Sequence, residues 1–344
     1  MDCRDFDGQV VRLEGIRDIA DKFVRVRLTR IDGMDLNLFE FDYDLTFMVF
    51  FLNKDKEIYG RYGGRDSESA DSRQSLEGLK YAMQSVLGMH EREDKAFAPK
   101  SESSSQFIKE FNGRKSKGCM HCHQVKEALD SELHRLARWS RDNVWRYPLP
   151  ENLGIILEVN RGDRVKEIKA KSPAAEAGLR KGDVLKRLNG VPIHSFADAQ
   201  YALDIAPGEG TIPIIWQRDG KDLQEKLALP QGWRKTDASW RPSVRHLIPS
   251  ARLGGADLTA AERKRLGLSE KQLAFRESEP VSRQAQEAGI RAGDIILGLD
   301  EAPLEMNLNQ FQDYVRGTFL IGDKLTIVLL RDGKRTKATM TLLR

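Results

Sequence analysis

The sequence has few cysteines, no long apolar run and little net charge. Its three cysteines, Cys3, Cys119 and Cys122, are too few for a disulfide framework in a chain of 344 residues. No apolar run approaches the ~18 residues that a membrane span requires, so we expect no span. A net charge of +4 gives no reason to expect a nucleic-acid partner. What remains is the ordinary composition of a soluble, folded protein.

The start of the chain shows no export signal. Met1 is followed at once by the charged segment DCRDFDG, where a signal peptide would have a basic start and an apolar stretch. The sequence therefore predicts either a cytoplasmic protein or one whose true start lies upstream of Met1. In the second case we expect a periplasmic or other extracytoplasmic location.

The first 96 residues alternate between helical and strand patterns. Apolar residues at helical spacing predict a helix over 10–23, and alternating apolar and charged residues predict a strand over 23–31. The apolar run at 45–52 favours a strand buried on both faces, followed by a hairpin partner at 57–64. A second helix is predicted over 72–88, ending at a glycine.

This order, with Cys3 at the head of the first helix, resembles a thioredoxin-like domain that begins at its active site. In that family a C-x-x-C turn precedes the helix, whose N-terminus lowers the thiol pKa. The resemblance gives Cys3 the role of resolving thiol and puts the attacking residue before Met1. It extends to a bacterial family that joins thioredoxin-like and PDZ domains, some members of which carry selenocysteine. With a complete N-terminus it implies a thiol or selenol oxidoreductase, although no proline precedes Pro99 to supply the family's cis-proline.

A Ser-rich stretch at 97–110 leads into the segment GCMHCHQVKEALDSELHRLARW, which contains the spacing C-x-x-C-H. In a c-type haem site, Cys119 and Cys122 would bind the haem covalently and His123 would be an axial ligand of the iron. A redox-active dithiol is the second interpretation. The third is zinc held by the two cysteines with His121, His123 or His134.

An internal repeat marks the second half of the chain. The strings SPAAEAGLRKGDVLKRLNGVPI (172–193) and VSRQAQEAGIRAGDIILGLDEAPL (281–304) share a core of EAG followed by an apolar residue, Arg and Gly-Asp. The repeated glycines suit left-handed turns, and each Gly-Asp leads into an apolar strand. A repeated string of this kind indicates a duplicated module.

Both copies resemble bacterial PDZ domains of the HtrA type. In the first copy the resemblance makes NLGIILEV the carboxylate-binding loop and strand, and FADAQYALDIA the helix that faces it. It implies that a polypeptide C-terminus or extended strand adds beside the loop. The implied peptide-binding residues are the amides of Leu153, Gly154 and Ile155, with Ala199 and Leu203 closing the pocket.

The second copy departs further from the PDZ pattern. Its loop region is placed at LGLSEKQLAFRES (266–278) and its helix at NQFQDYVRG (309–317), so peptide binding and packing against the first copy are both open. Trp233 and Trp240 in the stretch between the copies favour packing of one module on the other. The sequence contains no GxSxG or comparable signature, which predicts that the chain is not a serine protease.

Together these features predict an α+β multidomain protein with a partial thioredoxin-like domain, a short helical Cys/His segment and two PDZ-like β-barrel or sandwich domains. The predicted boundaries are 1–96, 97–150, 151–231, 232–263 for a linker, and 264–344. The predicted function is a redox-associated scaffold in which the PDZ modules bind polypeptides and a redox partner is recruited. The alternative is a non-enzymatic interaction protein with structural zinc, and haem c or zinc is the expected cofactor.

Overall fold

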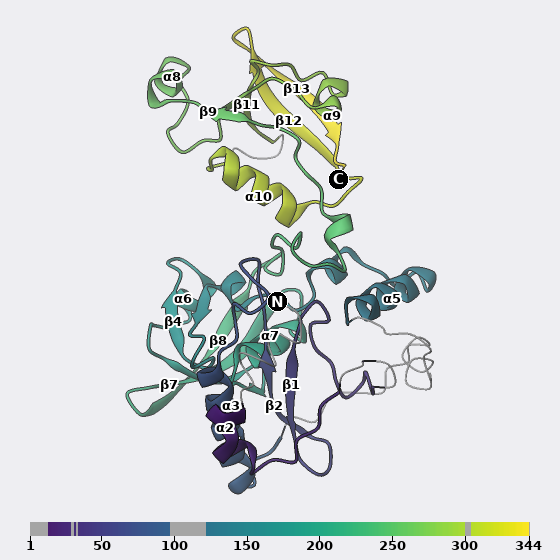
Figure 1. Cartoon of the computed structure of the whole chain (residues 1–344). Helices are drawn as coiled ribbons and strands as arrows, with labels where there is room; N and C mark the ends of the chain where they lie inside the picture. Colours follow the sequence, from purple (N-terminus) through teal and green to yellow (C-terminus); the bar gives the residue numbers. More distant parts are fainter. Residues whose placement is uncertain (1–12, 29–30, 32–33, 97–121, 300–303, 344) are drawn as a thin grey trace. The chain divides into compact units, whose positions relative to one another are not determined.

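The computed structural model describes residues 13–28, 31, 34–96, 122–299 and 304–343. The chain divides into two compact units, Met1–Lys235 and Thr236–Arg344, and each is described by itself (Figure 1). None of the helices in the described ranges is both long and apolar enough to span a bilayer.

The first unit mixes helices and strands along its length. In chain order they are α2 (Leu13–Ala20), β1 (Met48–Leu52), β2 (Ile58–Gly63), α3 (Leu76–Glu91), α5 (Cys122–Arg135), η1 (Arg141–Trp145), η2 (Pro150–Leu153), β3 (Ile155–Leu157), β4 (Val165–Ile168), α6 (Pro173–Glu176), β5 (Val184–Leu188), β6 (Val191–Pro192), α7 (Phe196–Asp204), β7 (Gly210–Arg218) and β8 (Lys221–Leu229).

The second unit resembles the later part of that order, with a helix added between its first two strands. Its elements are η3 (Arg245–Leu247), β9 (Gly255–Asp257), α8 (Ala260–Arg265), β10 (Phe275–Glu277), α9 (Arg283–Glu287), β11 (Ile295–Leu299), α10 (Leu308–Thr318), β12 (Lys324–Arg331) and β13 (Lys334–Thr341).

The N-terminal part of the first unit is a hairpin packed against two helices. β1 and β2 pair antiparallel, with Met48 opposite Gly63. Asn53 fixes the turn between them, because its side-chain oxygen accepts the backbone N–H groups of Asp55 and Glu57, each at 2.9 Å. Apolar side chains of α2, the hairpin and α3 form one buried cluster, so this part has a small core of its own.

The predicted thioredoxin-like sheet is not shown in this part. Residues 24–28 of the predicted strand form no regular structure, and the side chain of Val24 is 95% exposed. β1 is half-buried along most of its length and pairs with β2 in a two-stranded sheet, so it is not the strand buried on both faces that we expected. The second predicted helix is present as α3, capped by Ser75 and continuing to Glu91.

The first PDZ-like module has two small sheets with α7 packed against them. β3 pairs with β4, and the second sheet has the strand order β6-β5-β7-β8. The Asp183 carboxylate holds the repeated turn, accepting the backbone N–H of Arg180 at 2.8 Å and Arg218 Nε at 2.7 Å. Arg218 Nη2 also donates to the Gly178 carbonyl at 2.7 Å, which ties the end of α6 to β7.

The second module builds the same turn from its own copy of the repeat. Asp294 accepts the backbone N–H of Arg291 at 2.8 Å and Arg331 Nε at 2.8 Å, and Arg331 Nη2 donates to the Gly289 carbonyl at 2.7 Å. Its single sheet has the order β13-β12-β11-β10-β9. The duplicated sequence thus folds into a duplicated structure. β9 lies in the stretch 232–263 that we predicted to be a linker and pairs with β10 in this sheet, and the predicted domain boundaries stay predictions.

Candidate polypeptide-binding grooves

The predicted peptide-binding residues of the first module do come together. Leu153 ends η2, Gly154 follows it and Ile155 begins β3, while Ala199 and Leu203 lie on α7. The four apolar residues belong to one core cluster and have no exposed surface. They therefore lie inside the protein, and their role in binding stays a prediction.

Gly154 holds the loop in a shape that other residues could not take. Its backbone is left-handed, with φ of 87°, and a Cβ at this position would lie 2.1 Å from Ser172 Oγ. Its N–H donates to the Glu151 carbonyl at 3.1 Å, and its own carbonyl accepts the N–H of Lys169 at 3.0 Å. One of the three amides predicted to hold a carboxylate is thus engaged within the turn.

We call the region between the Leu153–Ile155 loop and α7 the first groove, and Arg73, from the segment that leads into α3, closes one end of it. Its Nη2 lies 2.7 Å from Glu151 Oε1, and its Nε donates to Asp66 at 2.7 Å. The guanidinium also stacks on the ring of Phe196 at 4.8 Å, so it joins the loop before β3 to the start of α7. Burial raises the pKa of Glu151, and the Arg73 charge opposes that shift.

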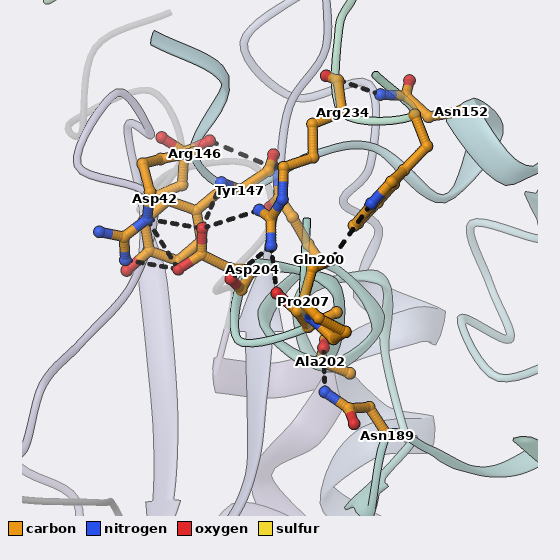
Figure 2. Close-up of polar contacts among 12 residues, drawn as sticks. Asp42, Arg146, Tyr147, Asn152, Asn189, Gln200, Ala202, Asp204, Pro207 and Arg234 are labelled. Atoms are coloured by element: carbon orange, nitrogen blue, oxygen red, sulfur yellow. Dashed lines mark hydrogen bonds and ion pairs between the residues drawn. The ribbon is translucent and has the colours of Figure 1, made fainter. Parts of the chain in front are cut away.

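Tyr147 contacts the C-terminal half of α7, where it bonds to Gln200 and Asp204 (Figure 2). Its N–H donates to Asp204 Oδ1 at 2.7 Å, and its carbonyl accepts Gln200 Nε2 at 2.9 Å. Arg146 Nε also donates to Asp204 at 2.7 Å. Burial alone would raise the pKa of Asp204, but the Arg146 charge and these hydrogen bonds hold it below its usual range.

The remaining face of α7 is covered by β2, so all nine residues of the helix are buried. Asp198 accepts the backbone N–H of Arg61 at 2.7 Å and that of His194 at 3.1 Å. Burial raises the pKa of Asp198 to about 7 despite the nearby Arg61 charge. The Arg61 guanidinium lies 3.5 Å from the ring centre of Tyr201. The first groove is therefore closed by the protein's own chain, which local sequence patterns did not predict.

The second module places its equivalent loop at Leu253–Gly255. The Gly254 carbonyl accepts the N–H of Ser278 at 2.9 Å, as the Gly154 carbonyl does from Lys169 in the first module. We expected this loop at 266–278 and predicted that 232–263, which includes Leu253–Gly255, would be a linker. The string RLGG, similar to NLGI of the first copy, is the signal that would have found it.

β9 follows this loop and is an edge strand of its sheet. Its residues Gly255, Ala256 and Asp257 are all exposed. α10 lies beside it, because the Leu308 N–H donates to Asp257 Oδ1 at 3.1 Å and Gln312 Nε2 donates to the Leu253 carbonyl at 3.1 Å. We call the surface along β9 and α10 the second groove, and the three residues of β9 are exposed on it.

A buried carboxylate lies beneath the second loop. Glu277, at the end of β10, is 3% exposed and pairs with Gly255 of β9. Its Oε2 accepts the Gly254 N–H at 3.1 Å. Burial, with a smaller contribution from the Asp294 charge, raises the pKa of Glu277 to about 7.

Ser85 of α3 contacts His194, which immediately precedes the N-cap of α7. Ser85 Oγ lies 2.7 Å from His194 Nδ1, and Nε2 of the ring lies 2.9 Å from Met89 Sδ. A hydrolytic triad needs a carboxylate on the second ring nitrogen, whereas Asp198 bonds the His194 main chain. This pair therefore joins α3 to the first module and does not identify a hydrolytic centre.

The cysteine and histidine cluster is described only in part. Cys3, Cys119 and His121 lie outside the described residues. Cys122 packs against an apolar cluster of the first unit, and His123 Nδ1 lies 3.1 Å from Glu127. Within the described ranges, no three His, Cys, Asp or Glu side chains gather as metal ligands would. The cofactor at this cluster stays untested.

Comparison with known proteins identifies a PDZ domain at residues 164–218, within the first module. Three curated relatives are periplasmic serine proteases by name. The "Probable periplasmic serine protease do/HhoA-like" of Haemophilus influenzae is 30% identical over 149 residues, which is 43% of this chain and 29% of that protein. The "Periplasmic pH-dependent serine endoprotease DegQ" of Escherichia coli is 29% identical over 42% of this chain and 29% of that protein. DegP of Salmonella typhimurium is 28% identical over 43% of this chain and 28% of that protein.

The chain thus spans about three tenths of the length of these relatives. Among solved structures, a serine endoprotease from Yersinia pestis is 23% identical, with a TM-score of 0.24, over 30% of this chain and 35% of that one. The HtrA-type protease AlgW with a decapeptide is 19% identical, with a TM-score of 0.25, over 47% and 49%.

These relatives correct the functional predictions made from the sequence. They are serine endoproteases, which contradicts the redox-associated scaffold and the thiol or selenol oxidoreductase. The alternative prediction, a non-enzymatic interaction protein, is also contradicted, because these relatives are enzymes by name. The prediction that the chain is not a serine protease is also contradicted, because serine endoproteases are the proteins it matches. The resemblance to HtrA-type PDZ domains is confirmed.

Proposed function

We propose that this chain recognises polypeptide substrates for proteolysis of the HtrA/DegP type, outside the cytoplasmic membrane. The PDZ match and the relatives, which are periplasmic proteases by name, support both the class of partner and the location. The site that carries this function is the second groove, between β9 and α10.

The exposed edge of β9 is the observation on which the proposal depends. An edge strand presents unpaired backbone groups, and an extended polypeptide can add to it through main-chain hydrogen bonds. All three residues of β9 are exposed, and α10 lies alongside to contact alternate side chains of an added strand. Main-chain binding of this kind is tolerant of sequence, which suits the capture of many different substrates.

The first module serves a different purpose in this proposal. Arg73 and Tyr147 close its groove, and the N-terminal part covers α7. Its PDZ domain is therefore a platform that holds the N-terminal part in place, while the second module does the binding.

The test is peptide binding by the full chain, measured by fluorescence anisotropy with a library of labelled extended peptides. Gln312→Trp fills the space between α10 and the loop and is expected to weaken binding at least tenfold. Thr336→Trp is the matched control, because it adds the same side chain at an exposed position of β13, at the opposite edge of the sheet from β9, and is expected to bind as the unchanged chain does. Equal binding by the two variants, or no binding by any peptide, would contradict the proposal. Labelling by a serine-reactive fluorophosphonate probe reports separately whether the chain carries a hydrolytic serine.

A further inference from the structure

A C-terminal carboxylate is held in a PDZ-type loop by successive backbone N–H groups that point at the ligand. The second module cannot offer that full set. The Gly254 N–H already donates to Glu277 Oε2 at 3.1 Å, inside the protein. The amide at the centre of the loop is therefore engaged by a carboxylate that belongs to the chain itself.

Glu277 replaces an apolar core residue of the first module. Its N–H donates to the Asp294 carbonyl at 2.8 Å, and its carbonyl accepts the N–H of Gly293 at 2.9 Å. In the first module Val165 makes the same two bonds with Asp183 and Gly182, each at 2.8 Å. Val165 is fully buried in the core. At the matching position the second module has a carboxylate that reaches the loop.

A ligand carboxylate at this loop would lose one donor and, above pH 7 where Glu277 is mostly ionised, would meet a negative charge. Like charges brought close together in a partly buried site repel strongly, because little water separates them. Asp294 adds to the negative charge around Glu277, although Arg331 pairs with it at 2.7 Å. An uncharged peptide backbone meets no such repulsion at the edge of β9.

We propose that the second groove selects internal extended segments of a polypeptide and discriminates against free C-terminal ends. This inference rests on the proposed function of the same groove and names its substrate class. The segment adds to β9 through its main chain and continues past the Leu253–Gly255 loop. Glu277 is the specificity-determining residue, since it removes the amide and supplies the charge that exclude a chain end.

The test uses one peptide sequence in three forms: with a free carboxylate, with a C-terminal amide, and extended by four residues. At pH 8 the full chain is expected to bind the amide and extended forms equally and the free acid roughly tenfold more weakly, as expected for a single short-range repulsion. Glu277→Gln keeps an acceptor for the Gly254 N–H and removes the charge, so the acid should regain most of that factor. Glu287→Gln, an exposed glutamate of α9, is the matched control and should leave the ratio unchanged.

The outcomes separate the two proposals. If no form of the peptide binds, the proposed function falls and this inference falls with it. If the free acid binds most tightly, the groove recognises polypeptides but this inference is wrong. It is also wrong if Glu287→Gln changes the acid-to-amide ratio as much as Glu277→Gln does, because the effect would then come from overall charge.

Discussion

Arg73 and Glu151 form an ion pair of 2.7 Å across the first groove, although one precedes α3 and the other lies in η2. Each side chain is only 15% exposed, so the pair is largely removed from water. The Asp66 carboxylate also pairs with Arg73, because its Oδ2 lies 2.7 Å from Arg73 Nε. The pair connects the N-terminal part of the first unit to the loop of the first module.

Removing Arg73 should destabilise the first unit. Arg73→Ala leaves the buried Glu151 carboxylate without its counter-charge, which is expected to cost about 2 to 3 kcal/mol in the free energy of unfolding. Arg73→Ala combined with Glu151→Gln should lose less than the single variant, because the uncompensated charge is gone. Urea unfolding measures both. Arg92→Ala, at a more exposed pair with Asp94, should change stability by less than about 0.5 kcal/mol.

Arg218 and Arg331 occupy equivalent positions in the two modules, and we expect each to stabilise only its own unit. The side chain of Asp294 is 2% exposed and depends on Arg331 for its counter-charge, as Asp183 depends on Arg218. Arg331→Ala should therefore destabilise the second unit by about 2 kcal/mol and leave the first unit unchanged. Hydrogen exchange resolved by segment checks this, since protection should fall within 236–344 alone. Equal loss of protection in both units would show that they do not unfold independently.

His194 predicts a loss of stability at acid pH. Burial, with the Lys186, Arg187 and Arg92 charges, lowers its pKa to about 4 from an ordinary value of 6.5. Neutral His194 is thus favoured in the folded protein. Its contribution is complete above pH 6.5 and is lost as pH falls through 4, for a total of about 2 to 3 kcal/mol.

Urea unfolding of the unchanged chain and of His194→Gln, measured at intervals between pH 7 and 4, isolates this contribution. The variant should lose less stability over that range, because glutamine does not titrate. Identical slopes for the two proteins would show that His194 is hydrated and titrates normally. The carboxylates of the chain also titrate here, but they are common to both proteins and cancel in the difference.

The repeat was predictable from sequence because its structure is local. Gly178 and Gly289 are left-handed, and Asp183 and Asp294 bond the chain within three residues, so a short string specifies each turn. The helices α3, α7 and α10 follow from apolar periodicity and capping residues for the same reason.

The closure of the first groove could not be predicted in this way. Arg73 meets Glu151 and Phe196 only after the chain has folded, and nothing near Arg73 in the sequence marks it as a contact for that loop. At Val24 a local pattern gave a wrong prediction. Apolar and charged residues alternate around it, which predicts a strand, but a strand also needs a partner strand to pair with, and Val24 is exposed. Cys3 and the C-x-x-C-H spacing predict redox chemistry, whereas the family comparison matches the PDZ domain at residues 164–218.

Glu277 predicts a pH dependence opposite in sign to that of His194. Burial raises its pKa to about 7 from 4.5, so the protonated form is favoured in the folded protein. Its contribution to stability is complete below pH 4.5 and is lost as pH rises through 7. Glu277→Gln should therefore be more stable than the unchanged chain at pH 8, by about 2 to 3 kcal/mol, and nearly equal to it at pH 4.

Val165→Glu in the first module is a useful comparison, since a carboxylate placed in a core without a designated N–H partner should be destabilising at pH 8 and less so at pH 4. Denaturant unfolding at the two pH values gives both differences. If Glu277→Gln were no more stable at pH 8 than at pH 4, relative to the unchanged chain, Glu277 would be charged in the fold without cost, and the groove would have a negative charge at every pH at which substrates are bound.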